Sequence, residues 1–145
     1  MPYLLALIII FLLMLVAACV DARSRRFPFA LFIALACTCL LASWLRDGPR
    51  LVAVNALMAL GVCGTLVLLE LAWRAFHQGA AGLGMGDIKY LFAVMLWRPM
   101  LGIASVCGGL FTLAVCGVIL RRPSLPLLPF AVPVAFVFAL ATHTV

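Results

Sequence analysis

Four carboxylates are present in this chain of 145 residues: Asp21, Asp47, Glu70 and Asp87. Asp87 lies in the stretch GLGMGDIKY (82–90), a glycine-rich turn with apolar sequence on both sides. Asp21 directly follows the first long apolar segment, at the expected C-terminal end of a helix, where the helix dipole disfavours a negative charge. The positions of Asp21 and Asp87 suggest that the two act together.

Two aspartates at the same depth of a partly dry site are suited to activating water against an amide. One ionised carboxylate takes the proton from water, while the other, protonated, donates a hydrogen bond to the scissile carbonyl. Close like charges cannot both ionise cheaply, so such a pair shares one proton and titrates as a unit. The structural alternative is that Asp87 only stabilises a helix N-terminus. On spacing alone, the dyad and two separate helix-end residues are equally good hypotheses.

The other two carboxylates have simpler interpretations. Asp47 lies in RDGPR (46–50), where Gly and Pro predict a turn with a solvated aspartate. Glu70 precedes the end of an apolar segment, and Arg74, four residues later, is spaced to pair with it on one helix face. We predict an ion pair for Glu70, although an ionisable residue inside a span is also a candidate for function.

The chain as a whole is too apolar to cover itself with polar residues in water. Hydrophobic residues make up 68% of it and charged residues 10%, with a mean hydropathy of +1.33, whereas a soluble domain is about a quarter charged. In lipid only helices or closed barrels satisfy the backbone. Long continuous apolar runs favour helices over the alternating segments of a barrel. We predict an all-α integral membrane protein, with residues 1–145 forming a single transmembrane domain.

Six apolar segments are expected to be transmembrane helices, which need about 20 residues each. The fourth has only the ten residues from Ile88 to Trp97, about 15 Å of helix against a hydrocarbon core about 30 Å thick. Either this helix begins near Gly82, or the glycine turn dips below the membrane surface and borders a cavity. The six segments are 3–20, 27–45, 51–73, 88–97, 101–120 and 127–142.

The first apolar segment is interpreted as a retained helix and not as a signal peptide. No Lys or Arg precedes it, and Asp21 and Arg23 follow where a cleavage site should be. We therefore expect it to remain in the membrane as the first span.

Basic residues between the segments predict the orientation. With six spans, the connections after the first, third and fifth lie on the same side of the membrane. This side is richer in Lys and Arg, and the richer side normally faces the cytoplasm. Both termini are then on the outer side, and Asp21 and Asp87 lie near the cytoplasmic face. The seven basic residues of that face are Arg23, Arg25, Arg26, Arg74, Lys89, Arg121 and Arg122, and the three of the other are Arg46, Arg50 and Arg98.

This asymmetry explains the net charge of +6 better than binding to nucleic acid does, so the expected partner is the lipid bilayer. The six cysteines fall inside apolar runs and form no C-x-x-C pair, which favours a packing role over a metal site or a disulfide. No metal or cofactor is expected.

Three stretches of the sequence, in order, resemble motifs of the bacterial prepilin peptidases, or type IV leader peptidases. GMGD (84–87) fits the G-x-G-D motif shared by intramembrane aspartyl proteases, and GMGDIKYLFAVMLW (84–97) resembles the family's second catalytic motif. DARSRRFP (21–28) is similar to its first motif, and LPFAVP (128–133) to the start of its final span. The short chain is similar to the peptidases of tight-adherence (Flp-type) pilus systems.

The resemblance implies an aspartyl endopeptidase with Asp21 and Asp87 as catalytic residues. Such an enzyme removes the basic leader from a pilin precursor, its partner, at the cytoplasmic face of the inner membrane. Larger members carry a zinc-binding loop with paired C-x-x-C motifs and also methylate the new N-terminus. That loop is missing here, so N-methyltransferase activity is not expected. The family often has Asn after the Pro of its first motif, where this chain has Phe29.

Three residues beside Asp87 are further candidates for the site. Gly84 and Gly86 either permit close approach of an extended substrate or simply form the turn. Lys89 either contacts a carboxylate, in the dyad region or in the substrate, or anchors the helix at the membrane interface.

Other polar residues receive no place in the site. Arg23, Arg25 and Arg26 are interpreted as orientation signals, because they would repel a basic leader. His77 is assigned no role. The alternative function is a non-enzymatic transport or pilus-assembly component with Asp21 and Asp87 in a proton or ion path.

Overall fold

The computed structural model describes residues 2–24, 27–76, 84–120 and 126–143. Over these residues the chain is helical throughout and has no strand, which confirms the all-α prediction for this part of the protein. Three of the helices, α1, α2 and α4, are long and apolar enough to cross a membrane. The helices are α1 (Pro2–Ser24), α2 (Phe29–Phe76), α3 (Met85–Trp97), α4 (Pro99–Leu120) and α5 (Leu128–His143).

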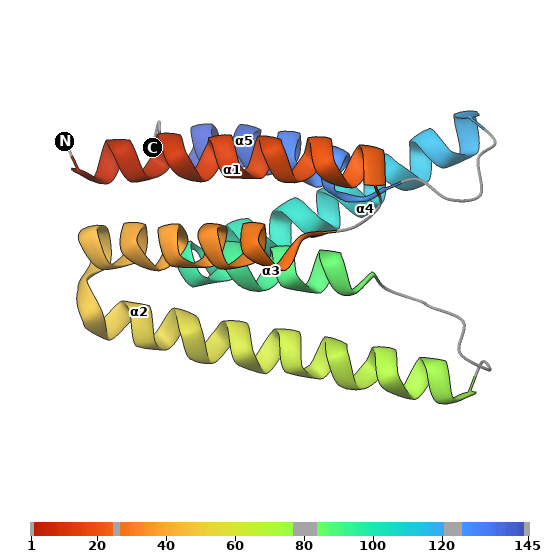
Figure 1. Cartoon of the computed structure of the whole chain (residues 1–145), viewed down its shortest axis with the longest axis horizontal. Helices are drawn as coiled ribbons and strands as arrows, with labels where there is room; N and C mark the ends of the chain where they lie inside the picture. The colour runs from red at the N-terminus through yellow and green to blue at the C-terminus, as the bar shows by residue number, and fades with distance from the viewer. Residues whose placement is uncertain (1, 25–26, 77–83, 121–125, 144–145) are drawn as a thin grey trace.

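Helix α2 consists of two arms that meet at a bend. Its 48 residues are interrupted at Gly48, where φ is 76° and ψ is 175°, and Pro49 follows. This backbone conformation is open to glycine and strained for other residues. The two arms double back and run in opposite directions (Figure 1). They correspond to the predicted segments 27–45 and 51–73.

Helix α3 is the short central helix of the bundle. It has 13 residues, about 20 Å, and begins at Met85, three residues before the predicted start of the fourth segment. Eight of its residues, from Ile88 to Trp97, are buried, because α2 and α4 pack against it. Neighbouring helices therefore shield α3 from lipid, and it does not need the length of an exposed span.

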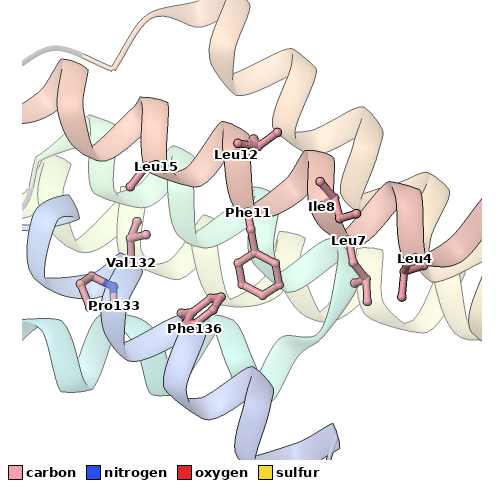
Figure 2. A pocket seen from close by; sticks show the side chains of 9 residues that line it. All are labelled: Leu4, Leu7, Ile8, Phe11, Leu12, Leu15, Val132, Pro133 and Phe136. Atoms are coloured by element: carbon pink, nitrogen blue, oxygen red, sulfur yellow. The ribbon is translucent and has the colours of Figure 1, made fainter.

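Helix α5 packs against α1 and α4. An apolar groove of about 520 Å³ runs between α1 and α5 (Figure 2). In its middle the rings of Phe11 and Phe136 meet edge to face, with centroids 5.1 Å apart. The residues that line the groove are all apolar, so it provides no group for catalysis. They are Leu4, Leu7, Ile8, Phe11, Leu12, Leu15, Val132, Pro133 and Phe136.

The bundle has two distinct ends (Figure 1). The start of α1, the end of α5 and the bend at Gly48 lie at one end, called here the terminus end. The C-terminal ends of α1 and α2 and the start of α3 lie at the other. Since Asp21 is in the last turn of α1 and Asp87 in the first turn of α3, we call this the aspartate end.

Candidate active site

Asp21 belongs to the face of α1 that points into the bundle. The buried residues of α1 recur every three or four positions, a spacing that places them on one stripe of the helix. Asp21 is the last member of this stripe and is only 9% exposed. Because α1 continues to Ser24, Asp21 lies inside the last turn and not beyond the helix as predicted. The stripe consists of Ala6, Ile10, Met14, Ala17, Ala18 and Asp21.

Asp87 lies in the first turn of α3, ahead of the apolar run from Ile88 to Trp97. Gly84 is the N-cap, with φ −68° and ψ 130°. The backbone N–H of Asp87 donates to the carbonyl of Gly84 at 3.0 Å, and the Asp87 carboxylate accepts a hydrogen bond from the Gly84 backbone. Such a reciprocal arrangement satisfies donors that a helix N-terminus otherwise leaves unpaired. It holds the half-buried carboxylate at the tip of the helix.

A side chain at either glycine of the G-x-G-D motif would crowd a neighbouring residue. A Cβ atom on Gly84 would lie 2.8 Å from Oδ2 of Asp87. A Cβ atom on Gly86 would lie 3.1 Å from the Cβ of Phe27. Gly84 therefore lets the aspartate fold back on the helix tip, and Gly86 lets the chain after α1 approach α3 closely. The sequence suggested that these glycines form the turn or allow close approach of a substrate, and it did not indicate these two contacts.

The contact between Gly86 and Phe27 is a part of the site that the sequence did not reveal. Phe27 is 8% exposed and belongs to the stretch DARSRRFP that also holds Asp21. Its spacing from Asp21 and the Pro after it indicated only where the next helix begins. The structure joins the two aspartate-containing motifs through this contact.

The electrostatic environment of Asp87 includes the charge of Asp21. Burial raises the pKa of Asp87 from 3.8 to about 6, the charge of Asp21 acts in the same direction, and the hydrogen bond from Gly84 opposes them. Asp21 is therefore close enough to act on Asp87 through its charge, although 66 residues separate them in sequence. When two carboxylates cannot both ionise easily, the pair retains one proton, which the two can share.

Lys89 points away from this pair. Two residues along a helix correspond to about 200° of rotation, so Lys89 and Asp87 project from nearly opposite sides of α3. The Lys89 ammonium lies 5.8 Å from the centroid of the Phe29 ring, and no ion pair of Lys89 occurs within the described ranges. This geometry fits the interface anchor better than a contact with the dyad.

Of the remaining carboxylates, Glu70 is placed as predicted, whereas Asp47 is partly buried and ion-paired and not the solvated turn residue that the sequence predicted. Glu70, 4% exposed, accepts a hydrogen bond from Nε of Arg74 at 2.7 Å, which confirms the predicted ion pair. Asp47 lies beside the bend of α2 at the terminus end and pairs with Arg46 at 3.4 Å. Asp21 and Asp87 are thus the pair of carboxylates in which the charge of one affects the pKa of the other. Arg25, Arg26, His77, Gly82, Arg121 and Arg122 lie outside the described residues.

Comparison with known proteins gives one finding. A model of the type IV leader peptidase family matches residues 8–143, a region that contains Asp21, Asp87 and both glycines of the G-x-G-D motif. No curated protein and no solved structure matches the chain.

Proposed function

This chain belongs to the type IV leader peptidase family, and from that premise we propose that it is an aspartic endopeptidase that removes the basic leader from pilin precursors. Asp21 and Asp87 are its proposed catalytic residues. One observation carries this assignment. Asp21 is buried in the last turn of α1, and its charge helps to raise the pKa of Asp87 in the first turn of α3.

The proposed reaction uses one water and one proton shared by the dyad. The ionised carboxylate takes a proton from water as the water oxygen bonds to the scissile carbonyl carbon. The protonated carboxyl stabilises the carbonyl oxygen, on which negative charge develops. When the C–N bond breaks, the first aspartate returns its proton to the leaving amine. The chain's own groups complete this cycle with no metal or cofactor in the proposed mechanism.

The glycines and Lys89 have supporting roles in this proposal. Gly84 and Gly86 set the distance of Asp87 from its own helix tip and from the segment after Asp21. Lys89, above the Phe29 ring, holds the start of α3 at the membrane interface. None of the three touches the reacting atoms in the proposed mechanism.

The direct test is a processing assay in membranes. A pilin precursor with a basic leader is co-expressed with this chain, and the loss of the leader is followed by gel shift. Cells with the precursor alone provide the control. We expect the shorter product only when the chain is present. If the shorter product does not form in its presence, the peptidase assignment is wrong.

The proposed membrane arrangement has six spans in a single domain over residues 1–145 of the bacterial inner membrane. It counts the two arms of α2 separately and includes the short helices α3 and α5, of 13 and 16 residues. The aspartate end is then cytoplasmic, and both termini are on the outer side. The fold supports this proposal because α1 and the first arm of α2 run in opposite directions (Figure 1).

This topology predicts opposite accessibility of the two ends of the bundle. In a background without the native cysteines, a cysteine at Ser24 should react only with a membrane-permeant maleimide in intact cells. A cysteine at Asp47 should react with an impermeant one. Labelling of both positions from the same side would contradict the topology and the cytoplasmic location of the site.

Cleavage should also depend on pH. Because the pKa of Asp87 is raised to about 6, the shared proton is lost as the pH rises through that value. We expect the cleavage rate to fall above about pH 6, approaching a tenfold loss per pH unit, as expected for loss of a single required proton. A rate that stays constant between pH 6 and 8 would contradict a proton shared at this pKa, and Asp47→Asn should leave the profile unchanged.

The raised pKa of Asp87 also affects the free energy of unfolding. Its effect falls as the pH rises, whereas the effect of a salt-bridged aspartate grows as the pH rises. A carboxyl group whose pKa is higher in the folded state binds an extra proton there. Its contribution to the free energy of unfolding is present below pH 3.8 and is lost as the pH rises toward about 6. At neutral pH the folded protein therefore bears the cost of a charged Asp87.

A further inference from the structure

A cavity with several polar side chains in its lining is formed by segments that lie at the terminus end of the bundle. These segments lie at the end away from the start of α3, which carries Asp87 (Figure 1). The volume of the cavity is about 340 Å³, and it forms where the bend of α2, the junction between α3 and α4 and the end of α5 meet. Its polar lining includes Arg46, Asp47, Asn55, Arg98 and Thr142. Nothing in the proposed peptidase reaction uses these residues.

Arg98 provides this cavity with a positive charge that pairs with no carboxylate of the described residues. Its Nη1 donates to the hydroxyl of Thr142 at 3.0 Å, and its guanidinium lies 5.7 Å from the centroid of the Trp97 ring. Within the described part of the chain, Arg98 has no ion pair. The cavity lining contains one carboxylate, Asp47, which already pairs with Arg46. A guanidinium has five N–H donors in a fork that matches an oxyanion, and one of those of Arg98 is bonded to Thr142.

The start of α4, with its backbone donors, also borders the cavity. Helix α4 begins at Pro99, and the residues after it, Met100 and Leu101, line the cavity. The N–H groups of a first helical turn have no acceptor within the helix, and the helix dipole adds positive potential there. The cavity lining also includes Trp97, whose buried indole N–H has no hydrogen-bond partner among the described residues.

Part of the cavity lining is apolar. Leu51 of α2 and Phe138 of α5 line it, and both lie in segments that the sequence predicts to be in the membrane. A ligand that matches this lining has an anionic head that contacts Arg98 and the start of α4. The rest of the ligand is apolar. Phosphate is one of the anions that such donor sets recognise, and it is the one that a membrane phospholipid carries together with apolar chains.

We propose that this cavity binds the phosphate of an anionic membrane phospholipid, with its acyl chains along Leu51 and Phe138. The lipid joins three separate elements: the bend of α2, the junction of α3 with α4, and the end of α5. Because α3 carries Asp87 at its other end, the bound lipid stabilises the helix that positions the proposed dyad. The binding site itself does not depend on the peptidase assignment.

Lipid binding by the purified chain tests this inference. In neutral detergent, phosphatidylglycerol should raise the unfolding temperature and stay bound in native mass spectrometry, and zwitterionic phosphatidylcholine should do neither. Arg98→Gln should weaken phosphatidylglycerol binding about tenfold, the effect of losing a charge-assisted hydrogen bond. Arg50→Gln is the matched control, because Arg50 is an exposed arginine near the same bend that does not line the cavity.

Several results would overturn the proposal. Equal binding of the two lipids would show that the charge of Arg98 selects nothing. Equal weakening by Arg50→Gln and Arg98→Gln would show a general surface effect. Inorganic phosphate that stabilises the protein as much as the lipid would assign the cavity to a free anion. Should Arg98→Gln fail to fold, the competition between the two lipids on the unsubstituted chain decides the question alone.

Discussion

Asp21→Asn and Asp87→Asn should each abolish leader cleavage, with a loss of at least about a thousandfold, while the protein remains folded in the membrane. Asn is nearly isosteric with Asp, so packing around the buried Asp21 and the hydrogen bond from Gly84 to residue 87 should survive. An amide, however, neither takes a proton from water nor shares one. Catalytic groups that act as a unit are non-additive, so the double variant should be no worse than either single one.

Controls separate lost chemistry from lost structure. Asp47→Asn changes the same residue type at the terminus end and should process the precursor normally. At neutral pH, Asp87→Asn should unfold at or above the temperature of the unsubstituted chain, because it removes a charge that burial and Asp21 disfavour. If the Asp87→Asn protein is well expressed and still trims the leader at a near-normal rate, the dyad is wrong and the ion-path alternative gains support.

Gly86→Val should reduce cleavage by about a hundredfold with a smaller effect from Gly86→Ala. A Cβ at residue 86 lies 3.1 Å from the Cβ of Phe27, so Ala requires a shift of a few tenths of an ångström and Val requires more. The shift separates the start of α3 from the segment that follows Asp21. Misplacement of a catalytic group by about 1 Å costs roughly a hundredfold in rate. The measurement is the initial rate of leader loss at equal membrane levels of each variant.

Gly61 provides the matched control for this substitution. It is an exposed glycine in the second arm of α2, and a Cβ there has nothing within 4 Å. Gly61→Val should therefore leave cleavage unchanged. Equal activity of Gly86→Val and Gly61→Val would show that the contact with Phe27 does not position Asp87.

The sequence by itself determined the class of the protein and the identity of its candidate site. A composition with 68% hydrophobic residues excludes a water-covered surface, so the helical, membrane-embedded fold follows from the need to satisfy the backbone in lipid. The ion pair of Glu70 with Arg74 followed from helical spacing. The two aspartates stood out because carboxylates are rare in such a chain, and the motifs around them were sufficient to indicate the family.

Only the tertiary structure decided which side of each helix faces inward. In a soluble protein the apolar stripe of a helix marks the core, but lipid is as apolar as a protein interior, and this signal disappears. In α1 the large residues Leu5 and Leu12 are exposed, at 62% and 57%, while Ala6 and Ala17 are buried. The inward position of Asp21 was therefore not readable from hydrophobicity.

The contacts between distant segments were equally outside the reach of the sequence. The fit of Gly86 against Phe27, the position of Lys89 over Phe29 and the grouping of Arg98 with Thr142 depend on how the helices pack. Local sequence sets the length and polarity of each helix, which is why the apolar segments could be recognised. The close approach of two helices depends on side-chain shape at positions far apart in the chain, and this shape complementarity exists only once the bundle has formed.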